Sequence, residues 1–304
     1  MIASVSLAEQ DGLAEALGRS FADYGFAIVR DHGIPQALIE EAEGYAKMLF
    51  ALPEETKRHY AIPGGGGARG YTPFGIETAK GGNAHDLKEF WHVGRELPAG
   101  HPFRAVMPDN VWPEEVGGFR ATMLALYDAF DAAGLKVLAA VARYLQVDEG
   151  YFADTVRDGN SVLRLLQYPP QPEPTGAHIR AGAHEDINTI TLLLGAEEAG
   201  LELLTSDGRW IPVSPKPGEL VINIGDMLQR LTNGRLRSTS HRVVNPAPDR
   251  AAHARYSMPF FLHFRPDYVI EALPGTVKAG EAPLWPPITA HDYLLERLRE
   301  IKLA

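Results

Sequence analysis

The sequence contains no cysteine among its 304 residues. This absence excludes disulfide scaffolds, thiolate zinc sites, iron–sulfur clusters and a cysteine nucleophile. Basic residues are also few, because the chain has 29 Lys and Arg against 39 Asp and Glu, which gives a formal net charge of −10. The acidic balance argues against binding to a phosphate backbone or to an anionic membrane surface. We therefore expect neither nucleic acid nor a membrane as a partner.

Long apolar runs are missing as well. No segment approaches the roughly 20 apolar residues that a membrane-spanning helix needs. The first ten residues, MIASVSLAEQ, lack the basic and apolar regions of a signal peptide. These absences predict a cytoplasmic protein. The apolar fraction of 45% is nevertheless typical of a globular chain with a full core.

The first half of the chain shows mainly helical periodicity. Apolar residues recur every three or four positions over residues 7–23, 35–52 and 113–145. Gly134 interrupts the last of these patterns and suggests a break between two helices. A short apolar run at 26–31 predicts a strand.

The second half changes to short β-branched and aromatic runs that are separated by turn signals. Such runs lie at 161–168, 188–194, 201–205, 219–224, 238–244 and 255–264. Strands without intervening helices indicate a sandwich or barrel rather than alternating βαβ units. We predict one folding unit over 1–304, with an all-β core and flanking helices. It comprises a mainly helical region at 1–150, a core at 151–270 and an extension at 271–304 that ends in an amphipathic helix.

Two histidines and an aspartate carry the predicted chemistry. His184 and Asp186 stand two positions apart in AHEDINTITLLL, at the entry to a predicted strand, so we expect their side chains on one face. His241 lies in a later strand pattern, STSHRVV. Two imidazoles and one carboxylate on one face of a metal leave neighbouring coordination positions open, which suits non-haem Fe(II). We therefore predict these three residues as catalytic metal ligands.

A second motif, Arg255-Tyr256-Ser257, follows the last of these ligands on another predicted strand. Arg255 and Ser257 share a strand face, where a guanidinium and a hydroxyl together form a receptor for a carboxylate. A metal beside such a receptor indicates a site for an organic acid that chelates iron.

With these residues the chain resembles the Fe(II)/2-oxoglutarate-dependent oxygenases, in the group that includes isopenicillin N synthase. The similarity covers most of the chain, and its motifs stand in the order that the family has. They are GFAIVRDHGI (25–34), RGY (69–71), DLKEFW (86–91), LRLLQYPPQP (163–172), HED (184–186), Gly225-Asp226, SHRVVNP (240–246) and RYSMPFFLHF (255–264). The resemblance implies a double-stranded β-helix, or jelly roll, with an N-terminal helical layer.

The resemblance also implies roles for single residues. The three predicted ligands would bind Fe(II), and Arg255 and Ser257 would hold the far carboxylate of 2-oxoglutarate. Tyr168 would donate a hydrogen bond to the same carboxylate. The family reaction uses 2-oxoglutarate and O₂ as cosubstrates, and it hydroxylates, desaturates or cyclises a small-molecule substrate.

Four further residues are candidates for substrate binding. Arg164 and His263 share strand parity with the residues that would hold 2-oxoglutarate, and the resemblance places Arg69 and Tyr71 where the family often builds its substrate pocket. An inward arginine needs an anionic partner. That partner is either a protein carboxylate or an acidic substrate.

Three alternatives stay open on the sequence alone. One is an isopenicillin N synthase-like iron oxidase that uses no 2-oxoglutarate and binds its substrate's own carboxylate at Arg255. Another is a jelly-roll protein that binds a metal or ligand without turnover. A zinc hydrolase would need a general base that the sequence does not identify. The run Gly64–Gly67 is either an active-site lid or an inert surface loop, and we expect a local Asx-type bond for Asp226.

Overall fold

The computed structural model of the chain describes residues 1–63, 67–76, 87–170, 180–194, 200–245 and 253–300. The helices are α1 (Leu13–Tyr24), α2 (Gln36–Phe50), α3 (Glu54–Arg58), α4 (Phe119–Leu145), α5 (Tyr151–Val156), α6 (Asp226–Leu231) and α7 (Ala290–Glu300), with a 3-10 turn η1 (Pro102–Ala105). The strands are β1 (Ala3–Ser6), β2 (Phe26–Arg30), β3 (Gly70–Thr72), β4 (Glu89–Gly94), β5 (Val162–Tyr168), β6 (Ala181–His184), β7 (Ile190–Leu194), β8 (Leu201–Leu204), β9 (Trp210–Pro212), β10 (Leu220–Ile224), β11 (His241–Val243), β12 (Arg255–Ser257), β13 (Pro259–Leu262), β14 (Val269–Ile270) and β15 (Ile288–Thr289). Among these helices, none combines the length and the apolar character that a membrane crossing requires.

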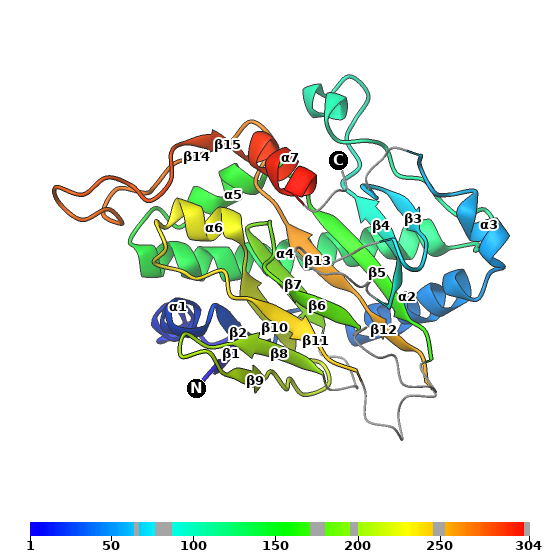
Figure 1. Cartoon of the computed structure of the whole chain (residues 1–304), viewed down its shortest axis with the longest axis horizontal. Coiled ribbons are helices and arrows are strands. Elements are labelled where there is room, and N and C mark those ends of the chain that lie inside the picture. Colours follow the sequence, from blue (N-terminus) through cyan, green and yellow to red (C-terminus); the bar gives the residue numbers. More distant parts are fainter. Residues whose placement is uncertain (64–66, 77–86, 171–179, 195–199, 246–252, 301–304) are drawn as a thin grey trace.

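Two sheets form the β core (Figure 1). The larger has the order β1-β2-β10-β7-β13-β5-β4-β3, with β12 also paired to β5, and the smaller has the order β6-β11-β8-β9. Side chains from both sheets share one apolar cluster, which includes Phe26, Leu203, Val221 and Val243. The two sheets therefore face each other, which confirms the predicted jelly-roll core.

Strand β10 shows how the alternating pattern divides the molecule. Leu220, Ile222 and Ile224 belong to the main core under the helices, whereas Val221 belongs to the cluster between the sheets. Successive side chains of a strand point to opposite faces, so Asn223 shares the inner face with Val221. The outer face of the larger sheet is thus a surface for helix packing, and the inner face is left to line a site.

Helix α4 packs on the outer face of the larger sheet (Figure 1). Phe130 stacks on Phe260 of β13 with ring centroids 5.4 Å apart, and Tyr127 meets the same ring edge-on at 4.9 Å. The predicted break at Gly134 is wrong, because α4 runs through it. A Cβ atom there would lie 2.4 Å from Cδ1 of Leu262, so the missing side chain lets the helix approach β13 closely.

The N-terminal half supplies strands as well as helices. Strands β1 to β4 all join the larger sheet, with β4 paired to β5 along its whole length. The larger sheet therefore extends beyond the predicted core at 151–270. The apolar run at 26–31 indicated β2, whereas β1 and β3 are only four and three residues long and were not predicted. This pairing brings β3 and β4, which carry most of the RGY and DLKEFW motifs, to the side of β5, the first long strand of the jelly roll.

Candidate active site

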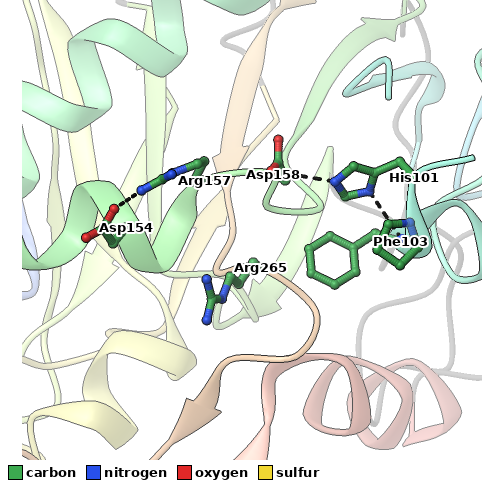
Figure 2. Close-up of a pocket in the computed structure, with 7 residues that line it drawn as sticks. His101, Phe103, Asp154, Arg157, Asp158 and Arg265 are labelled. Atoms are coloured by element: carbon green, nitrogen blue, oxygen red, sulfur yellow. Dashed lines mark hydrogen bonds and ion pairs between the residues drawn. The ribbon is translucent and has the colours of Figure 1, made fainter. Parts of the chain in front are cut away.

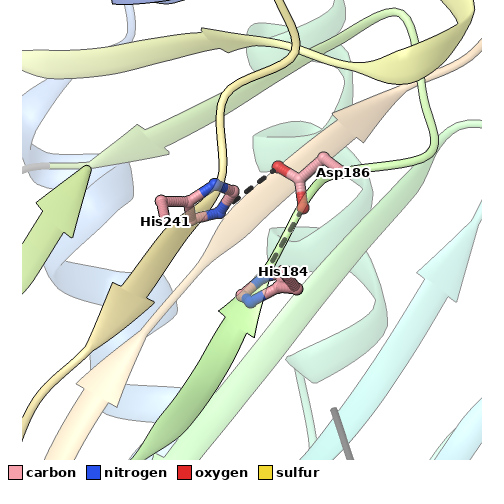
Figure 3. A group of neighbouring side chains, drawn as sticks. All are labelled: His184, Asp186 and His241. Atoms are coloured by element: carbon pink, nitrogen blue, oxygen red, sulfur yellow. Dashed lines mark ion pairs between the residues drawn. The ribbon is translucent and has the colours of Figure 1, made fainter. Parts of the chain in front are cut away.

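The three predicted ligands lie close together in the space between the two sheets (Figure 3). His184 is the last residue of β6 and His241 is the first residue of β11, and the two stand directly opposite each other in antiparallel register. Their ring centroids lie 4.4 Å apart. Asp186 lies in the loop after β6 rather than inside a strand, and its carboxylate points toward both rings.

The spacing of the donor atoms is compatible with one shared ion. Nε2 of His184 lies 3.8 Å from Oδ1 of Asp186, and Nε2 of His241 lies 3.9 Å from Oδ2. Two donors bound at about 2.1 Å to one ion are at most about 4.2 Å apart. Among the described residues, these three form the group of histidine and acidic side chains whose donor atoms gather within 4.8 Å of one another.

Backbone carbonyls orient both imidazoles. Nδ1 of His184 lies 2.7 Å from the carbonyl oxygen of Gly182, and Nδ1 of His241 lies 3.1 Å from that of Thr239. A carbonyl only accepts, so Nδ1 carries the proton in each ring and Nε2 keeps its lone pair. The two lone pairs face the carboxylate, which is the arrangement of metal-ligating histidines with their second nitrogen anchored.

Two neutral donors fix the carboxylate of Asp186. The hydroxyl of Thr191 donates to Oδ2 at 2.5 Å, and Nδ2 of Asn223 donates to the same oxygen at 2.8 Å. Both donors come from the inner faces of β7 and β10. The sequence reasoning missed them, although a threonine and an asparagine inside apolar strands were a visible signal.

The protonation states also favour a metal. Burial lowers the pKa of His184 to about 4, and the neighbouring imidazole of His241 acts in the same direction. Burial by itself would raise the pKa of Asp186, but the two imidazoles and the bonds from Asn223 and Thr191 hold it below its ordinary value. At neutral pH the site therefore presents a neutral imidazole and a carboxylate, the forms that bind metals. This donor set fits Fe(II) with open positions beside it.

The predicted carboxylate receptor lies on the inner face of β5 and β12. Arg255 is the register partner of Tyr168, and Ser257 is the partner of Leu166. The guanidinium carbon of Arg255 lies 5.2 Å from the centre of the Tyr168 ring. Arg180, just before β6, lies 5.7 Å from the same ring and is fully buried. Sequence reasoning missed Arg180, because the short strand that follows it was not predicted.

Arg164 lies on β5, and its position in the strand places it on the inner face with Tyr168, as its parity predicted. Its Nε donates to Nε2 of His92 at 2.6 Å. Its guanidinium carbon lies 4.3 Å from the ring centre of Phe90 and 5.1 Å from that of Phe261. The contacts of Arg164 thus include an imidazole and two aromatic rings.

His263 and Arg69 are two further predicted site residues, and they lie within electrostatic reach of each other. His263 directly follows β13 and is buried, and burial lowers its pKa to about 4. The charges of Asp186 and Arg69 both act on this pKa, so both lie within electrostatic reach of the imidazole. The guanidinium of Arg69 occupies the space that a side chain at Gly94 would fill.

Arg69 is only 2% exposed, and its hydrogen bonds go to neutral groups. It donates to the carbonyl of Ala68 at 2.7 Å and to Oδ1 of Asn160 at 3.2 Å. Its Nε has no hydrogen-bond partner among the described residues. Burial lowers its pKa to about 10.

The structure does not bring Tyr71 to this site. Tyr71 is the register partner of Trp91 and joins the main core on the outer face of the sheet. Its hydroxyl donates to the carboxylate of Glu89, which also pairs with Lys57 at 2.7 Å. The expected substrate role of Tyr71 is therefore wrong, because strand parity turns it away from the inner face. Residues 64–66 of the predicted lid lie outside the described residues.

A separate hollow of about 570 Å³ opens near η1 and the C-terminal end of α5 (Figure 2). Its lining includes no predicted site residue. Arg157 pairs with Asp154, Arg265 pairs with Asp267 at 3.0 Å, and Nε2 of His101 lies 3.7 Å from the carboxylate of Asp158. The charged groups of the hollow are thus engaged with nearby side chains, and the candidate site stays with the three predicted ligands between the sheets.

Comparisons with known proteins agree with this geometry. Residues 2–115 match the family model described as non-haem dioxygenase in morphine synthesis N-terminal, and residues 159–264 match the 2OG-Fe(II) oxygenase superfamily. The crystal structure of a 2OG-Fe(II) oxygenase family protein from Caulobacter crescentus is 56% identical, with a TM-score of 0.91 and 99% of each chain covered.

Two further relatives are described by their cosubstrate. A full-length protein of Neurospora crassa, whose crystal structure is in complex with alpha-KG, is 31% identical, with a TM-score of 0.87 over 97% of this chain and 95% of that one. The 2-oxoglutarate-Fe(II) type oxidoreductase hxnY of Emericella nidulans is 37% identical over 88% of this chain and 78% of its own. These relatives favour 2-oxoglutarate use over the iron oxidase, the zinc hydrolase and the protein without turnover. The chain belongs to the 2OG-Fe(II) oxygenase superfamily and is an Fe(II)- and 2-oxoglutarate-dependent dioxygenase that acts on a small molecule.

Proposed function

We propose that His184, Asp186 and His241 hold the Fe(II) of this dioxygenase. The observation that carries the proposal is the anchoring of both Nδ1 atoms on backbone carbonyls, which leaves both Nε2 atoms facing one carboxylate. Bound there, Fe(II) supplies the activation of O₂ that couples the oxidative decarboxylation of 2-oxoglutarate to substrate oxidation. The protein's part is to keep the ligands deprotonated, oriented and shielded from water.

Arg255, Ser257 and Tyr168 would hold the far carboxylate of 2-oxoglutarate. A guanidinium presents paired donors in a plane that matches a carboxylate, and two hydroxyls beside it complete the receptor. Support comes from the register of β12 on β5, which places Arg255 opposite Tyr168 on the inner face. Arg180 lies against the same tyrosine and adds positive charge to this end of the site.

The substrate would carry an acidic group. Arg69 is buried, its hydrogen bonds go to neutral groups, and its Nε has no hydrogen-bond partner among the described residues. A buried guanidinium is stable only when a counter-charge or full hydrogen bonding offsets its desolvation. A substrate carboxylate beside Arg69 and His263 would provide both, with Arg164 forming the aromatic-flanked side of the same pocket.

The pairing of the strands indicates how the chain is organised. Residues 1–304 would form one folding unit, because strands from both halves share one sheet and α4 packs across it. A cytoplasmic location and the lack of nucleic-acid or membrane partners stay predictions.

An anaerobic titration tests the cosubstrate site. Metal-free protein is loaded with Fe(II) and titrated with 2-oxoglutarate while the visible spectrum is recorded. We expect a metal-to-ligand charge-transfer band that is lost in His184→Ala, and a much weaker 2-oxoglutarate affinity in Arg255→Ala. Arg143→Ala is the matched control, since Arg143 bonds to Gln10 on the outer side of the fold. A full-strength band in His184→Ala would contradict the ligand set.

A panel of acids tests the substrate class. Small carboxylic acids and their neutral amides are compared for how strongly they stimulate succinate formation. We expect acids to exceed the matched amides by more than about tenfold, because an amide leaves the buried guanidinium without its counter-charge. We expect Arg69→Gln to remove that preference and Arg143→Gln to keep it. Equal stimulation by acids and amides would refute the acidic substrate.

A further inference from the structure

Asp226, the first residue of α6, is a buried carboxylate whose bonds are long-range. The predicted local Asx-type bond is not what its side chain forms. The hydroxyl of Tyr293 donates to its Oδ2 at 3.2 Å, and Nε of Arg297 lies 3.6 Å from the same oxygen. Both partners belong to the C-terminal helix α7. Asp226 therefore ties α7 to the body of the fold.

The backbone of the same residue is bonded to a predicted metal ligand. The N–H of Asp226 donates to the carbonyl oxygen of Asp186 at 2.7 Å. The next N–H, of Met227, lies 3.3 Å from the carbonyl oxygen of Ile187. One residue thus has its side chain on α7 and its backbone on the loop that carries Asp186.

Tight packing makes this connection stiff. Gly225 donates its N–H to the carbonyl of Thr189 at 3.0 Å, and a Cβ atom at Gly225 would lie 2.1 Å from the carbonyl oxygen of Asn188. Asn223, two residues earlier, holds Oδ2 of Asp186. Because the residues around Gly225 have no free space, a shift of Asp226 also moves the loop that carries Asp186.

Helix α7 has few other attachments. Only Ala290 and Tyr293 are buried among its residues. Its N-terminal end is held by two backbone bonds, from Ala290 to the carbonyl of Tyr268 at 2.8 Å and from His291 to that of Pro266 at 3.0 Å. A helix with so little buried apolar surface depends on specific polar contacts for its docking.

The contact between α6 and α7 uses a buried carboxylate, which is a costly way to hold a helix in place. An apolar contact would hold a surface helix at lower desolvation cost than a charged group that is 6% exposed. The carboxylate of Asp226 instead bonds to α7 with a defined geometry, while its own backbone bonds to Asp186. This arrangement therefore couples the position of α7 to the loop that carries Asp186.

We propose that Asp226, Tyr293 and Arg297 form a latch, through which the docking of α7 positions Asp186 for metal binding. The inference rests on the proposed role of Asp186 as a ligand. The three are positioning residues, because none of them is a predicted ligand. Undocking of α7 releases Asp226, and the loop that carries Asp186 then loses one of its anchors.

The test uses Co(II) as the probe, because its visible absorption reports both affinity and ligand geometry. Full-length metal-free protein is titrated as wild type, Tyr293→Phe, Asp226→Asn and the double variant. We expect Tyr293→Phe to weaken Co(II) binding about tenfold, the lower end for partners that orient a ligand. Tyr60→Phe is the matched control, because it removes a phenol–carboxylate bond, to Glu115 at 2.9 Å, that involves neither Asp226 nor α7. It should leave the affinity and the Co(II) spectrum unchanged.

A double-mutant cycle separates a latch from general loosening. If Tyr293 acts through Asp226, then Tyr293→Phe adds no further loss of Co(II) affinity in the Asp226→Asn background. Unchanged affinity and spectrum in Tyr293→Phe, with faster amide exchange of α7, would overturn the latch. His184→Ala keeps the two proposals distinguishable: Co(II) binding at wild-type strength in that variant refutes the ligand set itself, whereas its loss beside a silent Tyr293→Phe refutes only the latch.

Discussion

Two glycine-to-alanine changes test the packing of α4 on the jelly roll. Both glycines lie inside helices, where alanine stabilises by about 1 kcal/mol relative to glycine. In Gly44→Ala, on α2, the new methyl group meets nothing within 4 Å. In Gly134→Ala, on α4, it would lie 2.4 Å from Cδ1 of Leu262 and 3.5 Å from Cδ1 of Leu192, both fully buried.

The overlap at Gly134 sets the expected difference between the variants. Overpacking of a dense core costs about 1–3 kcal/mol, so Gly134→Ala should be less stable than Gly44→Ala by that amount. In a large domain this separates the thermal midpoints by at least about 2 °C. Thermal unfolding followed by circular dichroism measures both variants against wild type. An equal gain in stability in both would refute the close approach of α4 to β13, the strand that leads into His263.

Three further predictions concern the site and its surroundings. Asn223→Ala removes a donor to the carboxylate of Asp186 and should weaken Co(II) binding about 10–100-fold in a titration, with unchanged affinity as the contradicting result. His263 has a pKa lowered to about 4 by burial, below its ordinary value of 6.5. The unfolded chain then binds the extra proton first, so this group makes the metal-free protein lose stability as the pH falls from about 6.5 to about 4, by up to about 1.4 kcal/mol per pH unit. His263→Gln should flatten that slope in urea unfolding, and an unchanged slope would show that His263 is not buried as a neutral group. Tyr71→Phe should lower stability by about 1 kcal/mol through the lost bond to Glu89, with an unchanged KM for an acid that stimulates succinate formation. A changed KM for that acid at wild-type stability would return Tyr71 to the substrate site.

The clustering of His184, Asp186 and His241 could be predicted because much of its pattern is local in sequence. His184 and Asp186 stand two residues apart, and a second histidine in a strand pattern completes a donor set of known preference. Their meeting with His241 depended on the pairing of β6 with β11, which the strand order of a jelly roll supplies. The anchoring of both rings on carbonyls was not predictable, since any residue presents a carbonyl.

Long-range partners account for what the sequence did not reveal. Asp226 was expected to bond locally, but its partners lie on α7, some 67 residues away for Tyr293. Tyr71 lies in a strand of three residues, where a one-residue difference in register decides which face a side chain takes. Asn223 is visible in the sequence as an amide within an apolar strand, but its bond to Asp186 depends on the folded structure.

Anomalous diffraction at the iron edge tests the central claim most directly. Crystals of the full-length chain are grown without oxygen in the presence of Fe(II) and 2-oxoglutarate. We predict a peak within bonding distance of Nε2 of His184, Nε2 of His241 and the carboxylate of Asp186, with the far carboxylate of 2-oxoglutarate on Arg255. An iron peak elsewhere, or 2-oxoglutarate bound away from Arg255, would contradict the account.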